Sequence, residues 1–329
     1  MKFDYYYGSQ AEQFSFIEME IRDRFSVDND ITLFNGDCLE LIKQIPDESC
    51  DLIITSPPYC IGKEYEERKK DLESFVNQQK RIVEEVYRIL KIGGSVCWQI
   101  GYHITEQEVI PLDFYVYQVF NECSEKHDIP LKLRNRIIWT FGHGLNPSQR
   151  FSGRHETILW FTKGETYSFN LDSVRVPQKY PGKKSYRGNK KGEYSGNPLG
   201  KNPTDVWDIP NVKANHVEKT EHPCQFPVAI PSRFIKALTL EDGVILDPYM
   251  GSGTTGVAAV LEGRKFIGAE IQENYYKIAT DRIQQAIDGT VRVRPDVPVC
   301  EPNPKMAVAQ LPDEFRKARE EALSSRTLN

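Results

Sequence analysis

The sequence predicts an α/β fold, in which a mixed and mostly parallel sheet carries helices on both faces. Short β-branched or uncharged runs alternate with longer segments of helical periodicity, and this alternation is typical of parallel sheets. The chain has 329 residues, of which 39% are hydrophobic and 11% aromatic, so it can bury a sizeable core. Late in the chain, a glycine-rich turn joins a strand-like run to a helix-like run, a connection at which such sheets often bind ligands.

The first half of the chain divides into strands separated by two helices. A short helix expected at 38–44 is stopped by Pro46, and a longer one begins at Asp71 and repeats apolar residues to Leu90. The pair Gly93-Gly94 is expected to close the longer helix. The expected strands occupy residues 31–34, 52–55, 95–100, 136–141 and 156–161.

The regular pattern stops after residue 174 and returns after residue 221. We expect residues 1–174 to form the first half of one domain, 175–221 a loop-rich insertion, 222–287 the second half, and 288–329 an extended C-terminal tail. In the second half, helices are expected at 231–240, 256–261 and 275–287, and strands at 244–246 and 266–271. One further helix is expected at 312–323.

Positive charge is concentrated in the insertion. The net charge of the chain is −5 and its pI is about 5.8, yet residues 175–219 hold ten Lys or Arg against four Asp or Glu. A basic island in an acidic protein predicts an anionic partner, nucleic acid first, although a solvated loop would show the same run of charge. DNA contacts are expected from Lys183, Lys184, Arg187, Lys190 and Lys191.

Several protein classes lack their usual patterns here. The longest apolar runs have about five residues, against the roughly 20 that span a membrane, and the N-terminus has no secretory pattern. The seven cysteines form no CxxC pair, which favours a reducing, cytoplasmic location. None of the six histidines has metal-ligand spacing, so no metal site is predicted.

The glycine-rich turn contains Gly251, Gly253 and Gly256. Glycines let the backbone pass close to a ligand, and the N-terminus of a helix offers free N–H groups. Glu270 ends the next strand, where a carboxylate can bind two ribose hydroxyls. The turn therefore predicts an adenosine-containing cofactor, and a side chain at Gly253 is expected to enter the cofactor's path. A tight turn without a ligand is the alternative.

A second turn, Ser56-Pro57-Pro58-Tyr59, follows a buried strand. Its two prolines remove two backbone donors and stiffen the turn. The Ser56 hydroxyl and the Pro57 carbonyl can then accept both hydrogens of an exocyclic amine, which pulls the amine nitrogen toward a tetrahedral shape. Tyr59 offers a flipped base a face for stacking. A rigid turn with no catalytic role is the alternative.

Together, the two turns resemble the motifs of the β class of DNA amino-methyltransferases, in which the catalytic motif precedes the cofactor motif. Residues 35–39 resemble the segment of that class near the cofactor's adenine, 88–95 its helix-to-strand step, and 222–227 its motif X. The resemblance covers residues 31–287 and implies the S-adenosylmethionine-dependent methyltransferase fold, with 175–221 as the target-recognition region for duplex DNA.

The resemblance also implies roles for individual residues. The catalytic residues would be Ser56, Pro57, Pro58 and Tyr59. The residues that hold the cofactor, S-adenosylmethionine, would be Asp37, Cys38, Phe226, Pro227, Asp247, Tyr249, Gly251, Ser252, Gly253, Thr254 and Glu270. Because the family's Ser-Pro-Pro-Tyr forms mostly methylate cytosine N4, Ser56 favours that target, and adenine N6 is the alternative.

The implied reaction is a direct displacement at the sulfonium methyl after base flipping, without a covalent enzyme intermediate. A place in a restriction–modification system, with a cognate restriction endonuclease as partner, is expected, and an orphan or phage-borne methylase is the alternative. Two alternatives come from other classes. An NAD-dependent oxidoreductase would leave Ser-Pro-Pro-Tyr unexplained, and a non-catalytic DNA-binding module would leave the glycine turn unexplained. Pro223-Cys224 resembles the nucleophile motif of cytosine-C5 methyltransferases but lies before the glycine turn, so Cys224 is expected to be a packed residue.

Overall fold

The computed structural model describes residues 19–59, residues 72–295 apart from eight single positions, and Lys317. The eight positions are 106, 143, 145, 179, 181, 182, 198 and 214. By its internal contacts the chain divides into residues 1–296 and 297–329, and every helix and strand named below belongs to the first unit. The expected helix at 312–323 and most of the expected tail lie outside the described residues.

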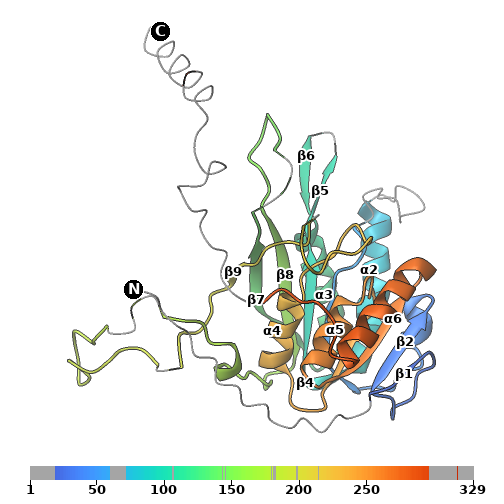
Figure 1. Cartoon of the computed structure of the whole chain (residues 1–329), viewed down its shortest axis with the longest axis horizontal. Coiled ribbons are helices and arrows are strands. Elements are labelled where there is room, and N and C mark those ends of the chain that lie inside the picture. The colour runs from blue at the N-terminus through green and yellow to red at the C-terminus, as the bar shows by residue number, and fades with distance from the viewer. Residues whose placement is uncertain are drawn as a thin grey trace. The chain divides into compact units, whose positions relative to one another are not determined.

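A large sheet forms the centre of this unit (Figure 1). Its strands are β1 (Ile21–Arg22), β2 (Ile31–Asn35), β3 (Cys50–Thr55), β4 (Leu90–Ile100), β7 (Leu131–Thr140), β8 (His155–Lys163), β9 (Val206–Asp208), β10 (Val244–Asp247) and β11 (Lys265–Glu270). They lie in the order β1-β2-β11-β10-β3-β4-β8-β7-β9. Neighbours are parallel except at β8, which is antiparallel to both β4 and β7. The predicted mixed, mostly parallel sheet is confirmed.

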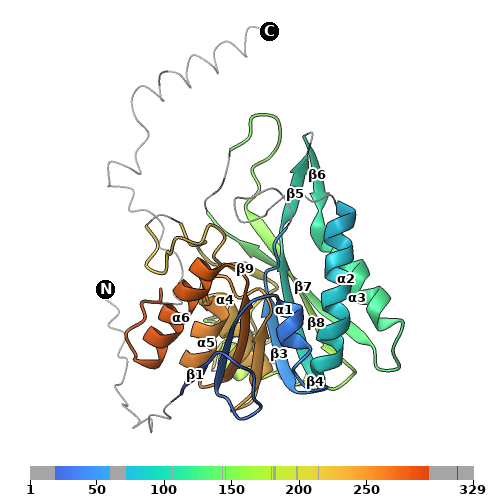
Figure 2. The same ribbon diagram turned by 90° about the vertical axis from the view of Figure 1, so that its right-hand side faces the viewer.

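Helices cover both faces of the sheet, as predicted (Figure 2). One face carries α1 (Cys38–Ile42), α2 (Leu72–Ile89) and α3 (Leu112–Ser124), and the other carries α4 (Ala229–Leu238), α5 (Thr254–Leu261) and α6 (Glu273–Ile287). The sequence of α2 explains its packing, because Phe75, Ile82, Val83 and Val86 recur at helical spacing and are all buried. No helix among the described residues is long and apolar enough to cross a bilayer.

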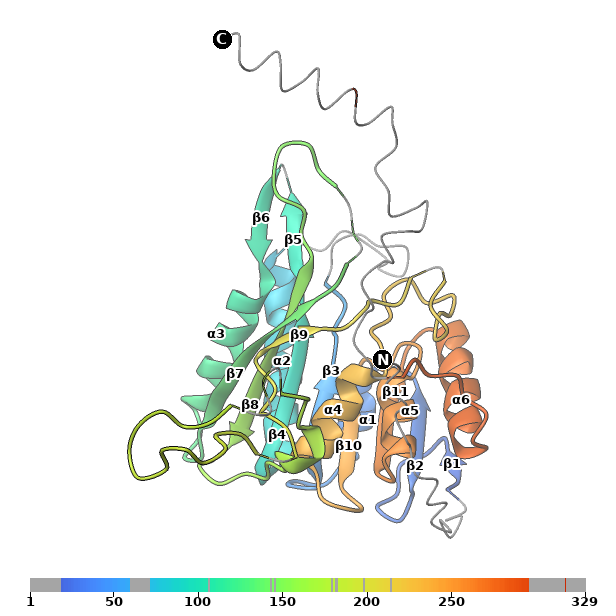
Figure 3. The same ribbon diagram turned by 60° about the vertical axis from the view of Figure 1, so that its left-hand side comes forward.

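Two features of the first half were not predicted from the sequence. α3 packs beside α2, and a hairpin of β5 (Tyr102–Thr105) and β6 (Glu108–Pro111) follows β4. The hairpin projects beyond the end of the large sheet (Figure 3). The insertion also contributes more than loops, because β9 pairs with β7 at the edge of the sheet.

The parallel strands place both sequence motifs at the same end of the sheet, where the strands have their carboxyl ends. β3 ends at the Ser-Pro-Pro-Tyr turn and β10 at the glycine turn, and these strands are direct neighbours, with Leu52 paired to Ile245. Thr55 and Asp247 are separated by 192 residues, yet the Thr55 hydroxyl donates to the Asp247 carboxylate at 2.7 Å. The fold thus brings the two predicted turns side by side.

α2 passes into β4 with no intervening turn, so the expected helix stop at Gly93-Gly94 is wrong. The helix ends at Ile89 and the strand begins at Leu90, and the two glycines lie within the strand. Gly93 has a φ of +83°. A Cβ on Gly94 would lie 3.0 Å from the Asp51 carbonyl oxygen, so this glycine permits the close approach of β3 to β4.

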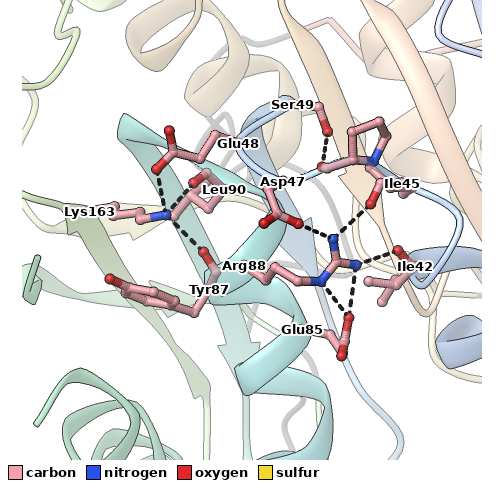
Figure 4. Close-up of polar contacts among 11 residues, drawn as sticks. Ile42, Ile45, Asp47, Glu48, Ser49, Glu85, Tyr87, Arg88, Leu90 and Lys163 are labelled. Atoms are coloured by element: carbon pink, nitrogen blue, oxygen red, sulfur yellow. Dashed lines mark hydrogen bonds and ion pairs between the residues drawn. The ribbon is translucent and has the colours of Figure 1, made fainter. Parts of the chain in front are cut away.

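A buried lysine holds the end of α2 in place (Figure 4). Lys163 is 3% exposed, and its ammonium donates to the carbonyl oxygens of Tyr87 at 3.1 Å and Leu90 at 2.9 Å. It also lies 3.2 Å from a carboxylate oxygen of Glu48. The last carbonyls of a helix have no partner within the helix, and Lys163 supplies one from β8.

The neighbouring arginine joins α2 to the end of α1 (Figure 4). Arg88 donates to the carbonyl oxygens of Ile42 and Ile45, both at 2.9 Å. It also pairs with Asp47 at 2.7 Å and Glu85 at 2.9 Å. The Arg88 guanidinium therefore serves as a cap for the short helix α1 from outside that helix.

Candidate active site

A cavity of about 860 Å³ lies at the carboxyl ends of the parallel strands, and both turns line it. Its walls come from two groups of elements. The ends of β2 and β11, the β10–α5 turn and the loop before α4 contribute Asp37, Cys38, Tyr249, Gly251, Ser252, Thr254, Glu270 and Phe226. The ends of β3, β4, β7 and β8 contribute Ser56, Pro57, Pro58, Tyr59, Gln99, Trp139, Phe141 and Glu156.

Glu270 fixes the conformation of the glycine turn. One of its carboxylate oxygens accepts the Gly251 N–H at 2.9 Å, and the other accepts the Gln272 N–H at 2.8 Å. Burial raises the pKa of Glu270 above its ordinary value, against the effect of these N–H groups. A carboxylate has about four acceptor positions, so Glu270 can still accept two hydroxyl groups from the cavity.

The two left-handed glycines of the turn have different neighbours. Gly251 has a φ of +54°, and a Cβ there would lie 3.1 Å from Nε2 of His222. Gly253 has a φ of +74°, and a Cβ there would lie 2.9 Å from Cα of Ala279 in α6. Only hydrogen fits at Gly253, but the expectation that a side chain there would enter the cofactor's path is wrong, because it would meet α6 instead.

Asp247 does not line the cavity but connects the two turns behind it. It is fully buried, and it accepts hydrogen bonds from the Thr55 hydroxyl at 2.7 Å, the Thr255 hydroxyl at 2.7 Å and the Tyr249 N–H at 3.1 Å. Burial raises the pKa of this carboxyl to about 6. Asp247 therefore positions both turns without touching a ligand.

Tyr59 is held by a polar chain at the end of β4 and β8. Its hydroxyl accepts from the Gln99 amide at 2.9 Å and lies 3.4 Å from a carboxylate oxygen of Glu156. The Gln99 amide also donates to Glu156. Burial, followed by the charge of Glu156, raises the pKa of Tyr59 well above its ordinary range, so Tyr59 stays a neutral phenol.

The predicted motif X segment forms another wall. His222, Cys224 and Phe226 line the cavity, whereas Pro227, although predicted to hold the cofactor, does not. Glu218 anchors the segment from behind, because its carboxylate accepts the Val228 N–H at 2.9 Å. Cys224 lies in the cavity wall and is partly exposed.

The structure does not bring the predicted DNA-binding cations to the cavity. In β8, Glu156 lies at the cavity, and Lys163, at the other end of the strand, lies roughly 23 Å from it. The segment that carries Lys183, Lys184, Arg187, Lys190 and Lys191 follows from that far end, opposite the β5–β6 hairpin (Figure 3). All five are exposed, and their role in DNA binding stays a prediction.

Other cations do line the cavity, and the sequence prediction missed them. Arg81 of α2 and Lys213, which follows β9, are both exposed and lie in its wall. Gln99, Glu156 and Trp139 were missed as well. Their signal in the sequence was their position at the ends of expected strands, but only the antiparallel return of β8 shows which ends meet.

A doubly covered α/β sheet with a proline-stiffened turn and a glycine turn in one cavity is the arrangement that the resemblance to amino-methyltransferases implies. The family model described as DNA methylase, of the N6/N4 type, matches residues 50–281. The chain therefore belongs to this family of DNA methyltransferases, whose cofactor is S-adenosylmethionine.

Relatives support the same family. The chain is 45% identical over 248 residues to the type II methyltransferase M.BglII of Bacillus subtilis, covering 75% of this chain and 67% of that one. It is 34% identical over 265 residues to the DNA adenine methyltransferase YhdJ of Escherichia coli K12, covering 78% and 83%. The fold is similar to that of the cytosine-N4-specific PvuII DNA methyltransferase, with a TM-score of 0.59 at 23% identity, covering 79% of this chain and 93% of that one.

The residues of the cavity fit S-adenosylmethionine. Gly251 keeps open the space beside His222 that a Cβ would fill. Glu270 follows Gly251 by 19 residues, close to the spacing of about 20 residues at which an acidic side chain binds ribose hydroxyls after a glycine turn. The cavity volume of about 860 Å³ lies within the range of small-molecule sites.

Proposed function

We propose that this protein methylates the N4 amine of cytosine in duplex DNA, as the modification enzyme of a restriction–modification system. The observation that carries the proposal is the single cavity shared by Ser56-Pro57-Pro58-Tyr59 and the Gly251–Glu270 pair. A cofactor bound over the glycine turn and a base bound at the proline turn would then meet within one cavity.

Glu270, Gly251 and Phe226 form the core of the proposed cofactor site. The Glu270 carboxylate would accept the two ribose hydroxyls, and Gly251 would let the backbone pass under the methionine part. Asp37, Cys38, Tyr249, Ser252 and Thr254 complete the lining. Asp247 and Gly253 support this site from behind through Thr255 and α6, and Pro227 lies next to it in the chain.

Ser56 and Pro57 are the proposed acceptors for the target amine. The lone pair of that amine is delocalised into the base, so the amine is a poor nucleophile. Two acceptors that take its hydrogens would favour a tetrahedral nitrogen with its lone pair directed at the methyl group. The bound cofactor supplies an electrophilic methyl group, so the chain mainly has to align the two atoms.

Tyr59 is the proposed stacking platform for a base flipped out of the duplex. The Gln99–Tyr59–Glu156 chain fixes the tyrosine hydroxyl, so the ring would already be oriented before DNA binds. Trp139 and Phe141 line the same part of the cavity and would enclose the base on its other sides.

Ser56 supports cytosine N4 as the target, because the family's Ser-Pro-Pro-Tyr forms mostly act there. Adenine N6 is the second candidate, and the 34% identity to the adenine methyltransferase YhdJ supports it. The restriction–modification role, with a cognate endonuclease as partner, is supported by the 45% identity to the type II methyltransferase M.BglII.

Analysis of the product tests the target directly. DNA from cells that express the protein would be digested to nucleosides, and N4-methylcytosine, N6-methyladenine and 5-methylcytosine would be quantified by mass spectrometry. N4-methylcytosine is the expected product, and N6-methyladenine alone would refute the cytosine assignment. 5-Methylcytosine that disappears in a Cys224→Ser variant would overturn the mechanism.

Two variants test the roles of Ser56 and Tyr59. Ser56→Ala should lower the rate of methyl transfer more than it lowers DNA affinity, because its hydroxyl acts on the amine as the bond forms. Tyr59→Phe keeps the ring and should keep most activity, whereas Tyr59→Ala should lose roughly five- to a hundredfold, since base–aromatic stacking is worth ~1–3 kcal/mol. Equal activity of the two Tyr59 variants would contradict stacking.

A further inference from the structure

A second cluster of reactive side chains lies outside the cavity, between α2 and the end of α3. Glu84 of α2 and Cys123 of α3 bring a carboxylate oxygen within 3.7 Å of a thiol. His127, just after α3, brings its Nε2 within 3.4 Å of the same carboxylate oxygen. The three atoms all lie within 4.8 Å of one another. Methyl transfer uses none of them.

The distances from the Glu84 oxygen to the thiol and to the imidazole match two edges of a tetrahedral zinc site. Zinc binds sulfur at about 2.3 Å and imidazole nitrogen or carboxylate oxygen at about 2.0–2.2 Å. Tetrahedral geometry then separates nitrogen from oxygen by roughly 3.3 Å and sulfur from oxygen by roughly 3.6 Å. The observed separations are 3.4 Å and 3.7 Å. Thiolate sulfur, imidazole nitrogen and carboxylate oxygen are all donor types that zinc binds in proteins.

We propose that Glu84, Cys123 and His127 bind one zinc ion, which fastens the end of α3 to α2. The thiol proton would pass to solvent when Cys123 coordinates the ion. The three residues leave a fourth coordination position, which water would fill. The proposal is independent of methyl transfer.

The imidazole of His127 is already oriented for this role. Its ring stacks on Tyr87, with the ring centres 3.8 Å apart and the planes 9° from parallel. The Tyr87 hydroxyl in turn donates to the Ile129 carbonyl oxygen at 3.0 Å. A ligand whose ring is held by its surroundings loses less freedom when it binds a metal.

One neighbouring cation competes with zinc for the cluster. Lys126 pairs with the other carboxylate oxygen of Glu84, so the oxygen that faces Cys123 and His127 is not the one in this ion pair. The side chain of Lys126 is 60% exposed, and it can move into solvent when the ion arrives. Removal of Lys126 should therefore strengthen zinc binding or leave it unchanged.

Titration of the full-length protein with metal alone tests the proposal. The chain would be freed of metal with a chelator and titrated with Zn²⁺ by calorimetry, and with Co²⁺ by absorption spectroscopy. One ion per chain and a sulfur-to-cobalt charge-transfer band are expected. The band should vanish in Cys123→Ser, and affinity should fall at least tenfold in His127→Ala and in Glu84→Gln.

Two control variants separate the cluster from general effects of charge. Glu125→Gln removes an exposed carboxylate next to the cluster and should leave zinc affinity unchanged, and Lys126→Ala should not weaken it. The absence of saturable binding by the wild-type protein would overturn the proposal. A charge-transfer band that survives in Cys123→Ser would overturn it too, because another cysteine would then hold the ion.

Discussion

Replacement of Asp247 by Asn should make the stability of the protein less dependent on pH. The wild-type carboxyl is fully buried, and its pKa rises from 3.8 to about 6 because burial disfavours its charge. Asn has the same shape. Its oxygen can accept from Thr55 and from the Tyr249 N–H, while its amide can donate to the Thr255 hydroxyl.

The sign follows from the raised pKa. A carboxyl that binds its proton more tightly in the folded state favours folding at low pH, and this advantage disappears as pH rises through its folded pKa. A shift of about two pKa units corresponds to about 3 kcal/mol. Between pH 4 and pH 7, the wild type should therefore lose about 2 kcal/mol relative to Asp247→Asn, because the first part of the loss falls below pH 4.

Urea unfolding of both proteins at a series of pH values measures this difference. All other titrating groups are common to the two proteins, so their effects cancel in the comparison. A difference in unfolding free energy that stays constant from pH 4 to pH 7 would show that Asp247 does not carry a raised pKa. Asp247→Ala removes the hydrogen-bond acceptor altogether and serves as the control. It should be less stable than Asp247→Asn at every pH because it leaves three donors without an acceptor.

Four further outcomes are expected. Gly253→Val should cost about 3 kcal/mol or more in urea unfolding, because it combines left-handed backbone with a clash against α6; unchanged stability would contradict the packing at this glycine. Lys163→Met should cost about 2–3 kcal/mol in unfolding free energy by removing the donor to the Tyr87 and Leu90 carbonyls, and a neutral result would mean that water replaces the ammonium. Glu270→Ala should weaken S-adenosylmethionine binding roughly ten- to a hundredfold in calorimetry. The affinity of the wild-type protein should also fall as pH is lowered through the raised pKa of Glu270, and the variant should lack this pH dependence. Arg81→Ala combined with Lys213→Ala should reduce the slope of log DNA affinity against log salt by about 1–2. A slope that changes only when the cations of residues 183–191 are neutralised would show that the basic island, and not the cavity, contacts the DNA.

Most of the fold could be predicted because its signals are local. Each parallel strand of the sheet's centre is a short apolar run, and the two turns that follow β3 and β10 carry their own residue patterns. α3 was not predicted although Leu112, Val116 and Phe120 recur at helical spacing, because its aromatic and β-branched residues are equally typical of a strand. The glycine pair 93–94 led to a wrong helix end, since glycine ends a helix and also allows two strands to approach closely.

The site was predictable only in part, because some of its residues are brought together by strand pairing rather than by a contiguous motif. Residues in contiguous motifs, such as Ser56 and Glu270, could be recognised without knowing what lies across from them. Gln99 and Glu156 could not, because the pairing of β4 with β8 decides that they meet at Tyr59. The DNA-binding role of the basic island was predicted from its charge and from the family resemblance, and neither says from which end of a strand the segment leaves.

The pairing of β3 with β10 has a consequence for how the enzyme folds. Nearly two hundred residues separate these strands, so the chain must close a very long loop before they can pair. The proposed cofactor site takes Asp37 and Cys38 from one half of the domain and Gly251 and Glu270 from the other, so it is incomplete until that closure has occurred. Ligand binding should therefore stabilise the whole unit against unfolding rather than one region of it, and hydrogen exchange in β3, far from the glycine turn in sequence, should slow when only S-adenosylmethionine is added.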